Sequence, residues 1–127
     1  MRQSFTVPNR LPGMNDLIAA NRVRYGKWSK GQELKKTWQE VVMAAIRLNG
    51  LKPIRSRCRI QYTFFEPNRR RDMDNISGFA HKVIQDALVD EGILANDGWS
   101  EISGYTDSFE VDKERPRIEV TLIYAGE

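Results

Sequence analysis

The sequence predicts an α+β fold: one small domain in which a mixed, mostly antiparallel sheet of about four strands is covered by two long helices. Two stretches have apolar residues at helical spacing, and four others have strand-like composition and are bounded by turn residues. The chain has 127 residues and no internal repeat, which fits a single domain over residues 1–127 with a core of its own.

The clearest helix is expected around residues 76–88. Apolar residues recur there at intervals of three and four, and Gly92 follows as a C-terminal stop. A second long helix is expected from about residue 32 to residue 48, and a short helix capped by Asn15 or Asp16 precedes it. The apolar stripe of the first helix consists of Ile76, Phe79, Ala80, Val83, Ile84, Ala87 and Leu88.

Four stretches are expected to form the sheet. Residues 4–7 form a first strand that Pro8 ends, and residues 55–65 alternate as a half-buried strand does. Residues 101–111 and 116–124 are joined by a short turn, so we expect them to pair with each other in antiparallel fashion. The inward side of the second strand carries Cys58, Ile60, Tyr62 and Phe64.

Asp72 and Asp74 are the first candidates for a catalytic site. In an extended chain their side chains point the same way, and Asn75 adds an amide oxygen beside them. Two carboxylates suit Mg²⁺, which typically takes one or two protein carboxylates together with water and substrate phosphate oxygens. Phosphodiester hydrolysis needs such an ion, with Mn²⁺ as the alternative, because the ion polarises the phosphoryl group and lowers the pKa of an attacking water.

A simpler interpretation is that Asp72 or Asp74 caps the helix that follows. The free N–H groups and the dipole of a helix N-terminus both favour a carboxylate. A calcium-binding loop is excluded by spacing, because counting from Asp72 puts Ser77 where glycine is required and Val83 where a bidentate glutamate is required. Capping and magnesium binding therefore both stay open.

The face of this helix opposite the apolar stripe carries Asp74, Gly78, Lys82 and Asp86, four residues apart. The Lys82 side chain is then expected to point along the helix toward the two carboxylates. Gly78 lies between them and would leave room for a DNA backbone to approach. The alternative is an exposed Lys82 that pairs with Asp86.

Asp97 is a third acidic candidate. By itself Asn96-Asp97-Gly98 is a turn signal. Its place beyond the helix suggests that a loop returns Asp97 to the cleft that holds the first two acids.

The single cysteine and the single histidine limit the available chemistry. Cys58 lies in an apolar alternation and is expected in the core, so one chain has no disulfide framework, zinc site or cysteine-based dyad. His81 is the only histidine and lies next to Lys82 in the predicted helix.

Two basic stretches are candidate DNA-binding elements. The first directly precedes the paired acids and would hold phosphates that the carboxylates repel. In the second, aromatic residues are interleaved with the charges, which suits nucleic acid because rings stack on unpaired bases. The alternatives are a merely solvated basic run and a loop whose two aromatics turn into the core. The first stretch is Arg69, Arg70 and Arg71, and the second contains Arg22, Arg24, Tyr25, Lys27, Trp28 and Lys30.

The overall charge agrees with a polyanionic partner without proving one. The chain has 20 Lys and Arg against 17 Asp and Glu, a net charge of +3, and the basic residues are clustered. No apolar run approaches a membrane span, and the first residues lead into a strand without a signal peptide. We therefore expect a cytoplasmic protein with no membrane partner.

The order of these motifs resembles the RusA family of Holliday junction resolvases. The resemblance rests on the arginine run, Asp72-x-Asp74-Asn75, a helix with Lys82 and Asp86-Ala87-Leu88, and Asn96-Asp97. Residues 11–16 and 30–34 are similar to the N-terminal part of the family, so roughly the whole chain is covered.

The resemblance implies roles for four residues. Asp72, Asp74 and Asp97 would be the metal ligands and Lys82 the catalytic lysine. In the family's usual pattern the lysine stands where this chain has Gly78, which leaves His81 as a second candidate for that role.

The resemblance also implies a RusA-like endonuclease that acts as a homodimer and needs magnesium but no small-molecule cofactor. Its activity would be to resolve Holliday junctions or related branched DNA by paired nicks in recombination and repair. Water would attack the phosphodiester directly, without a covalent intermediate. The alternatives are a catalytically inactive module that binds branched or single-stranded DNA, and a basic structural protein whose acids only cap helices.

Overall fold

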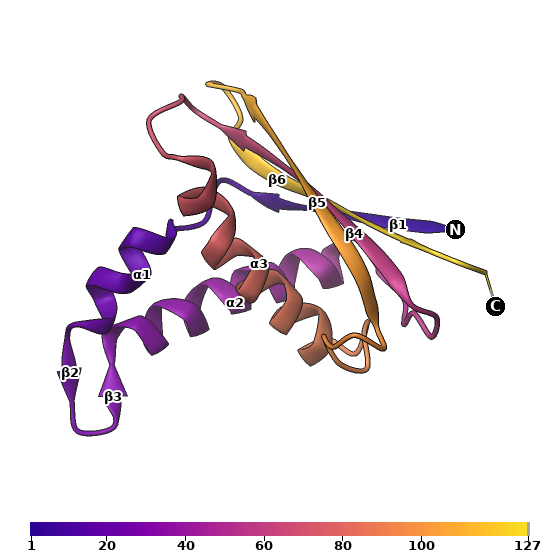
Figure 1. Cartoon of the computed structure of the whole chain (residues 1–127), viewed down its shortest axis with the longest axis horizontal. Helices are drawn as coiled ribbons and strands as arrows, with labels where there is room; N and C mark the ends of the chain where they lie inside the picture. The colour runs from indigo at the N-terminus through magenta and orange to yellow at the C-terminus, as the bar shows by residue number, and fades with distance from the viewer. Residues whose placement is uncertain (127) are drawn as a thin grey trace.

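The computed structural model describes residues 1–126 and contains a four-stranded sheet with three helices on one side of it (Figure 1). The predicted α+β domain with two long helices is confirmed. The strands of the sheet are β1 (Arg2–Pro8), β4 (Cys58–Glu66), β5 (Ile102–Val111) and β6 (Arg117–Tyr124), and the helices are α1 (Met14–Asn21), α2 (Lys30–Leu48) and α3 (Met73–Asp90). A separate hairpin is formed by β2 (Arg24–Tyr25) and β3 (Trp28–Ser29).

The strand order is β1-β6-β4-β5, with β4 antiparallel to β6 and parallel to β5. Helix α3 returns the chain to the end of the sheet from which β4 starts, so β5 runs parallel to β4. The expectation that residues 101–111 and 116–124 pair with each other is wrong. Their short connection crosses the end of β4, where the Asp112 N–H donates to the Glu66 carbonyl at 2.8 Å. β4 takes the central position because alternate side chains along it are fully buried.

One apolar core lies between the sheet and the two long helices. The inward apolar residues of β4 are at most 1% exposed, and all seven residues of the predicted stripe on α3 are buried in the same core. Helix α2 adds Val42, Ala45 and Ile46 to the same core. The core therefore fixes α3 along the sheet and determines where its two ends lie.

Two helices begin differently from the expectation. Gly13 is the N-cap of α1, and the carboxylate of Asp16 accepts the Gly13 N–H at 2.8 Å from inside the first turn. Asn15 is therefore not the cap, whereas Asp16 takes part in a capping box as the third residue of the helix rather than as the N-cap. Helix α2 starts two residues earlier than expected because Ser29 Oγ accepts the Gln32 N–H at 3.1 Å.

Candidate metal and nucleic-acid site

Asp72 and Asp74 lie at the N-terminal end of α3 and are exposed. Asp72 is the N-cap residue with an extended backbone (φ −67°, ψ 152°), whereas Asp74 is already in the first turn, so the chain is not extended through both acids as expected. The Asp72 side chain makes no capping hydrogen bond either. Within residues 1–126 neither carboxylate has a hydrogen-bond or ion-pair partner. The positive end of the helix dipole stabilises both anions, and their oxygens are available to a ligand.

The side chain of Asn75 joins the N-terminal ends of α1 and α3. Its Oδ1 accepts the backbone N–H of Asn15 at 2.7 Å. A Cβ at Gly13 would lie 2.6 Å from the same oxygen, so the close approach of the two helices favours glycine there. Asn75 Oδ1 therefore holds the two helix ends together and has one lone pair left for a further ligand.

Glu66, the last residue of β4, is a buried carboxylate with arginine partners. Arg71 donates from Nε and Nη2 to its two oxygens at 3.0 and 2.8 Å, and Arg10 lies 3.3 Å from Oε1. Arg71 also donates from Nη1 to the Leu11 carbonyl at 3.0 Å. This two-point contact fixes the loop between β4 and α3, so Arg71 is engaged inside the fold and is not a free phosphate ligand as predicted.

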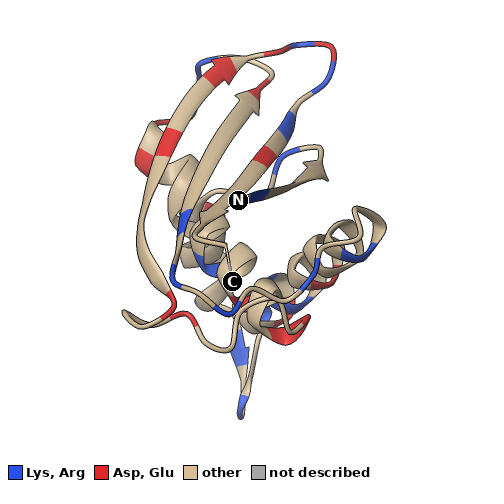
Figure 2. Cartoon of the chain, turned by 90° about the vertical axis from the view of Figure 1, so that its right-hand side faces the viewer, with Lys and Arg blue, Asp and Glu red and all other residues tan. Residues whose placement is uncertain are grey.

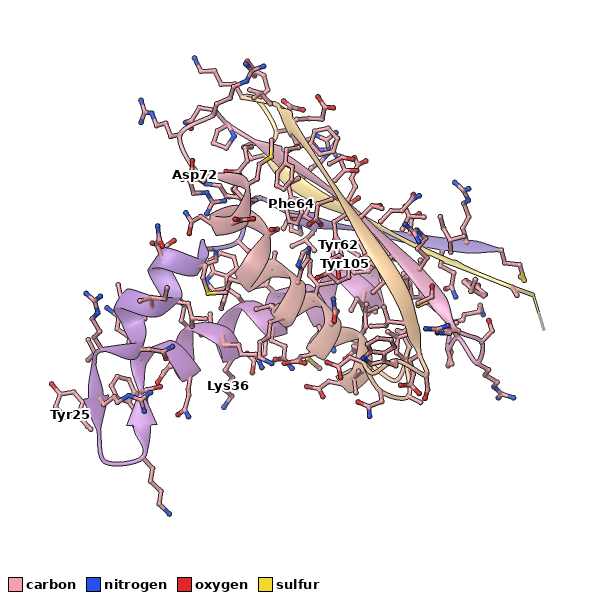
Figure 3. All side chains as sticks on the ribbon, viewed as in Figure 1. Tyr25, Lys36, Tyr62, Phe64, Asp72 and Tyr105 are labelled. Carbon is pink, nitrogen blue, oxygen red and sulfur yellow. The ribbon has the colours of Figure 1, made fainter. Side chains whose placement is uncertain are left out.

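A cavity of about 310 Å³ lies beside Asp72, between the β4–α3 loop and the end of β5. Three acidic residues line it, Glu66, Asp72 and Glu110, together with the exposed Arg69. Figure 3 shows Asp72 at the start of α3, close to this end of the sheet. The sequence interpretation missed Glu66, although it continues the inward side of the alternation in β4, where an acid is unusual.

Asp97 lies beyond the other end of α3. The helix has 18 residues and so spans about 27 Å. Asp97 borders a hollow with Lys35 and Asp90, not the cavity beside Asp72. The loop does not return Asp97 to the first two acids, and within the described chain no group of three or more acids, histidines or cysteines is placed to hold a metal ion. Asp72 and Asp74 remain as a two-carboxylate set.

Lys82 and His81 point in different directions. Lys82 has a side chain that is 66% exposed, and its Nζ lies 4.0 Å from Asp86 Oδ2, as in the pairing alternative. Asp86 has a closer partner in Lys35 of α2, at 2.5 Å. His81 faces the sheet, with Nε2 at 2.7 Å from Asp107 Oδ1. Of the two, only Lys82 presents its charge to solvent.

The glycine between Asp74 and Lys82 is covered by a side chain of α1. A Cβ at Gly78 would lie 2.9 Å from Met14 Cε, the far end of a flexible side chain. A DNA backbone that approaches Gly78 closely, as the sequence suggested, would therefore have to displace the Met14 side chain.

Two potential nucleophiles are buried in the core. Burial raises the pKa of the Cys58 thiol and that of the Tyr62 phenol above their ordinary values. Both groups are therefore protonated at neutral pH, and neither supplies an anionic nucleophile for covalent catalysis.

The second basic stretch is a hairpin that projects from the start of α2 (Figure 1). Tyr25 and Trp28 pair across it, with ring centroids 5.8 Å apart, and Gly26 turns the chain with φ 59°. The rings are not in the core, because Tyr25 is 74% and Trp28 40% exposed. Figure 2 shows the hairpin as a narrow projection that carries basic residues. The exposed cations are Arg22, Arg24, Lys27 and Lys30.

Comparison of the chain with models of protein families gives no match, and comparison with curated proteins gives none either. Among residues 1–126 no helix combines the length and apolar character needed to cross a membrane. The function is therefore inferred from the chemistry of the two acids, the arginines and the hairpin.

Proposed function

We propose that this chain is a magnesium-dependent, structure-selective endodeoxyribonuclease of the RusA type, which resolves four-way junctions or related branched DNA by paired nicks in recombination and repair. The observation that carries the proposal is the pair Asp72 and Asp74. Both carboxylates are exposed at a helix N-terminus, and neither has a partner in the described chain. The nearby buried acid Glu66, in contrast, has two arginine partners.

The donor set fits a hard divalent cation. Asp72 and Asp74 would hold Mg²⁺, which needs only one or two protein carboxylates and fills its other positions with water and phosphate oxygens. When bound, the ion polarises the phosphodiester and assists direct attack by water. Glu66 is a poor ligand because Arg71 already engages both of its oxygens.

The arginines next to the acids would hold the DNA backbone. Arg69 and Arg70 are exposed on the loop that leads to Asp72, so they can bind phosphates that the carboxylates alone would repel. Lys82 stands eight residues after Asp74, about 12 Å along the helix axis, which suits a flanking phosphate. His81 is turned toward the sheet and is the weaker candidate for a catalytic helper.

The hairpin would supply selectivity for branched DNA. Exposed rings can stack on unpaired bases at a branch point, whereas a continuous duplex keeps its bases stacked on each other. Tyr25 and Trp28 present such rings, and the surrounding cations neutralise phosphates. This division assigns base stacking to the hairpin and cleavage to the start of α3.

The proposal is tested with a labelled synthetic four-way junction and a linear duplex of the same arms, each with and without Mg²⁺. We expect wild type to make paired nicks in the junction only, and only with Mg²⁺. The Asp72→Asn variant should bind the junction without cutting it. Undiminished cutting by well-purified Asp72→Asn would contradict the site assignment.

A module that binds branched or single-stranded DNA without cutting it is the second candidate. Two observations favour it. Within one described chain Asp97 lies apart from Asp72 and Asp74, whereas the hairpin already presents both its aromatic rings and its cations. Tight, metal-independent binding with no cutting by wild type or Asp72→Asn would support it. A structural protein would lack the steep salt dependence of DNA binding, which for about six phosphate contacts has a log-log slope near −5.

A further inference from the structure

A groove of about 750 Å³ lies between α1, the first turns of α2 and the loop that joins β1 to α1. Figure 1 shows α1 and α2 running in different directions from the base of the hairpin, so α1 covers only part of the start of α2. This α1–α2 groove is distinct from the cavity beside Asp72, and Arg71 is the residue that borders both. It is therefore a second surface, which the proposed cleavage of DNA does not use.

The floor of the α1–α2 groove is apolar. Leu34 and Trp38 lie one helical turn apart on α2, and both pack against the core while they stay partly exposed. Farther along the same helix, Val42 and Ile46 are at most 1% exposed. The apolar stripe of α2 thus continues beyond the part that the fold covers, and this continuation can bury apolar groups of a ligand.

The rim of the groove is positively charged. Lys30 is exposed and has no ion-pair partner within residues 1–126. The Arg10 side chain is 39% exposed, and it lies 3.3 Å from Glu66, whose two oxygens Arg71 already engages. The acid that lines the groove, Asp16, already accepts a backbone N–H at the start of α1. The groove therefore favours an anionic ligand.

An apolar floor with a basic rim suits an amphipathic acidic peptide better than a nucleobase. A base stacks on the open face of an aromatic ring, whereas this floor is mostly aliphatic and its one ring, Trp38, is partly buried. Amphipathic peptide segments dock in such grooves through their apolar side chains. The Trp38 indole N–H is not buried and donates to no residue of the described chain, so it can donate to a peptide carbonyl or carboxylate.

We propose that the α1–α2 groove docks an acidic, amphipathic peptide segment of a partner protein. Apolar side chains of that segment pack on Leu34 and Trp38, and its carboxylates pair with Lys30 and Arg10. Because Arg71 borders both the groove and the cavity beside Asp72, the partner is held next to the start of α3. The docking needs neither DNA nor metal and goes beyond the proposed nuclease.

Peptide selection tests the proposal. A phage-displayed library of random peptides of about twelve residues is selected on the wild-type protein, and the binders are measured by fluorescence anisotropy at about 0.15 M salt. We expect the selected peptides to combine Asp or Glu with Leu, Ile or Phe. A library that yields no binder, or only binders without acidic residues, overturns the proposal.

Two pairs of variants test whether the peptides bind in the groove. Lys30→Glu reverses a charge on the rim and should weaken peptide binding about fivefold. Lys36→Glu makes the same change at an exposed position of α2 outside the groove and should weaken it less than about twofold. Leu34→Gln should weaken binding about tenfold, whereas Leu48→Gln, at a position that is 88% exposed, should leave it unchanged. Equal losses within either pair overturn the groove as the binding site.

Three further measurements complete the test. Lys30→Glu should fold, because the helix dipole favours a carboxylate in the first turn of α2, and thermal unfolding checks this for all four variants. Asp72→Asn should bind the peptides like wild type, so a failure of the nuclease proposal leaves the docking proposal intact. A single-stranded oligonucleotide that loses about tenfold in affinity for Leu34→Gln would assign the groove to nucleic acid and overturn the peptide.

Discussion

The two ends of α3 both carry acidic side chains, but the protein uses them differently. At the N-terminal end, Asp72 and Asp74 are exposed and have no side-chain partner in the described chain. At the C-terminal end, Asp86 forms an ion pair with Lys35 at 2.5 Å, and Asp90 accepts a hydrogen bond from Gln39. Helix α2 thus engages the acids at one end of α3 and leaves those at the other end free.

The helix dipole explains why this division is stable. Anions at a helix N-terminus are stabilised by the dipole, so Asp72 and Asp74 persist without a cation from the protein. Anions near the C-terminus are opposed by the dipole, so Asp86 and Asp90 need partners. A ligand site made of unpaired carboxylates is therefore expected at the start of α3 rather than at its end.

The largest effect on stability is expected from Arg71→Met. This change leaves the buried Glu66 carboxylate without its two-point partner, which should lower the free energy of unfolding by about 3 kcal/mol, as measured by urea denaturation. Arg70→Met is the matched control because its side chain is exposed, and it should change stability by less than about 0.5 kcal/mol. Equal losses of stability in the two variants would contradict the view that Arg71 has a structural role and Arg70 does not.

The contact between the two helix N-termini gives the next largest effect. Gly13→Ala should destabilise the protein by about 2 kcal/mol, because the new Cβ meets the Asn75 side chain. Removing that side chain as well, in Gly13→Ala with Asn75→Ala, should cost less than the sum of the two single changes. Additive losses would contradict the direct contact that positions the start of α3.

The hairpin should affect binding without affecting stability. Tyr25→Ala removes an exposed ring and should weaken junction binding about tenfold, as expected for the loss of one stacked base, while the unfolding midpoint stays the same. Lys27→Ala should instead reduce the salt slope by about one unit. An unchanged affinity of Tyr25→Ala for the junction would show that the Tyr25 ring on the hairpin does not contribute to DNA binding.

The smallest effect concerns the C-terminal end of α3. Lys35→Met should lower the free energy of unfolding by about 1 kcal/mol, since it removes the closest cation from Asp86. Lys82→Met should change it by less than about 0.5 kcal/mol, because Lys82 is mostly exposed and lies 4.0 Å from Asp86. A larger loss of stability in Lys82→Met than in Lys35→Met, measured by thermal or urea unfolding, would contradict the role of Lys35 of α2 as the main partner of Asp86.

The elements with strong local patterns were predictable from the sequence. The stripe on α3 and the alternation in β4 reflect packing against one core, and Gly92, with φ 73°, ends α3 where expected. The strand order was not predictable from local sequence, because β4 lies between β5 and β6 and pairs with both. Whether β5 pairs with β6 or with β4 is decided by distant parts of the chain and not by the turn that joins β5 to β6.

The arrangement of the candidate site was predictable only in part for the same reason. Asp72 and Asp74 were expected near each other at the start of the helix, because they are only two residues apart in the sequence. The position of Asp97 depends on the length of α3, and the role of Arg71 depends on Glu66 at the end of another element. The contact of Asn75 with Asn15 was not foreseen because Asn15 lies 60 residues earlier in the chain.

The most direct test of the central claim makes the same chemical change at both ends of α3. Asp72→Asn and Asp90→Asn are compared for Mn²⁺ binding and for magnesium-dependent cleavage of a four-way junction, with circular dichroism to confirm that both variants fold. We predict that Asp72→Asn loses metal binding and at least about a hundredfold in cleavage, while Asp90→Asn retains both. Equal activity in the two variants, or a loss confined to Asp90→Asn, would contradict the account.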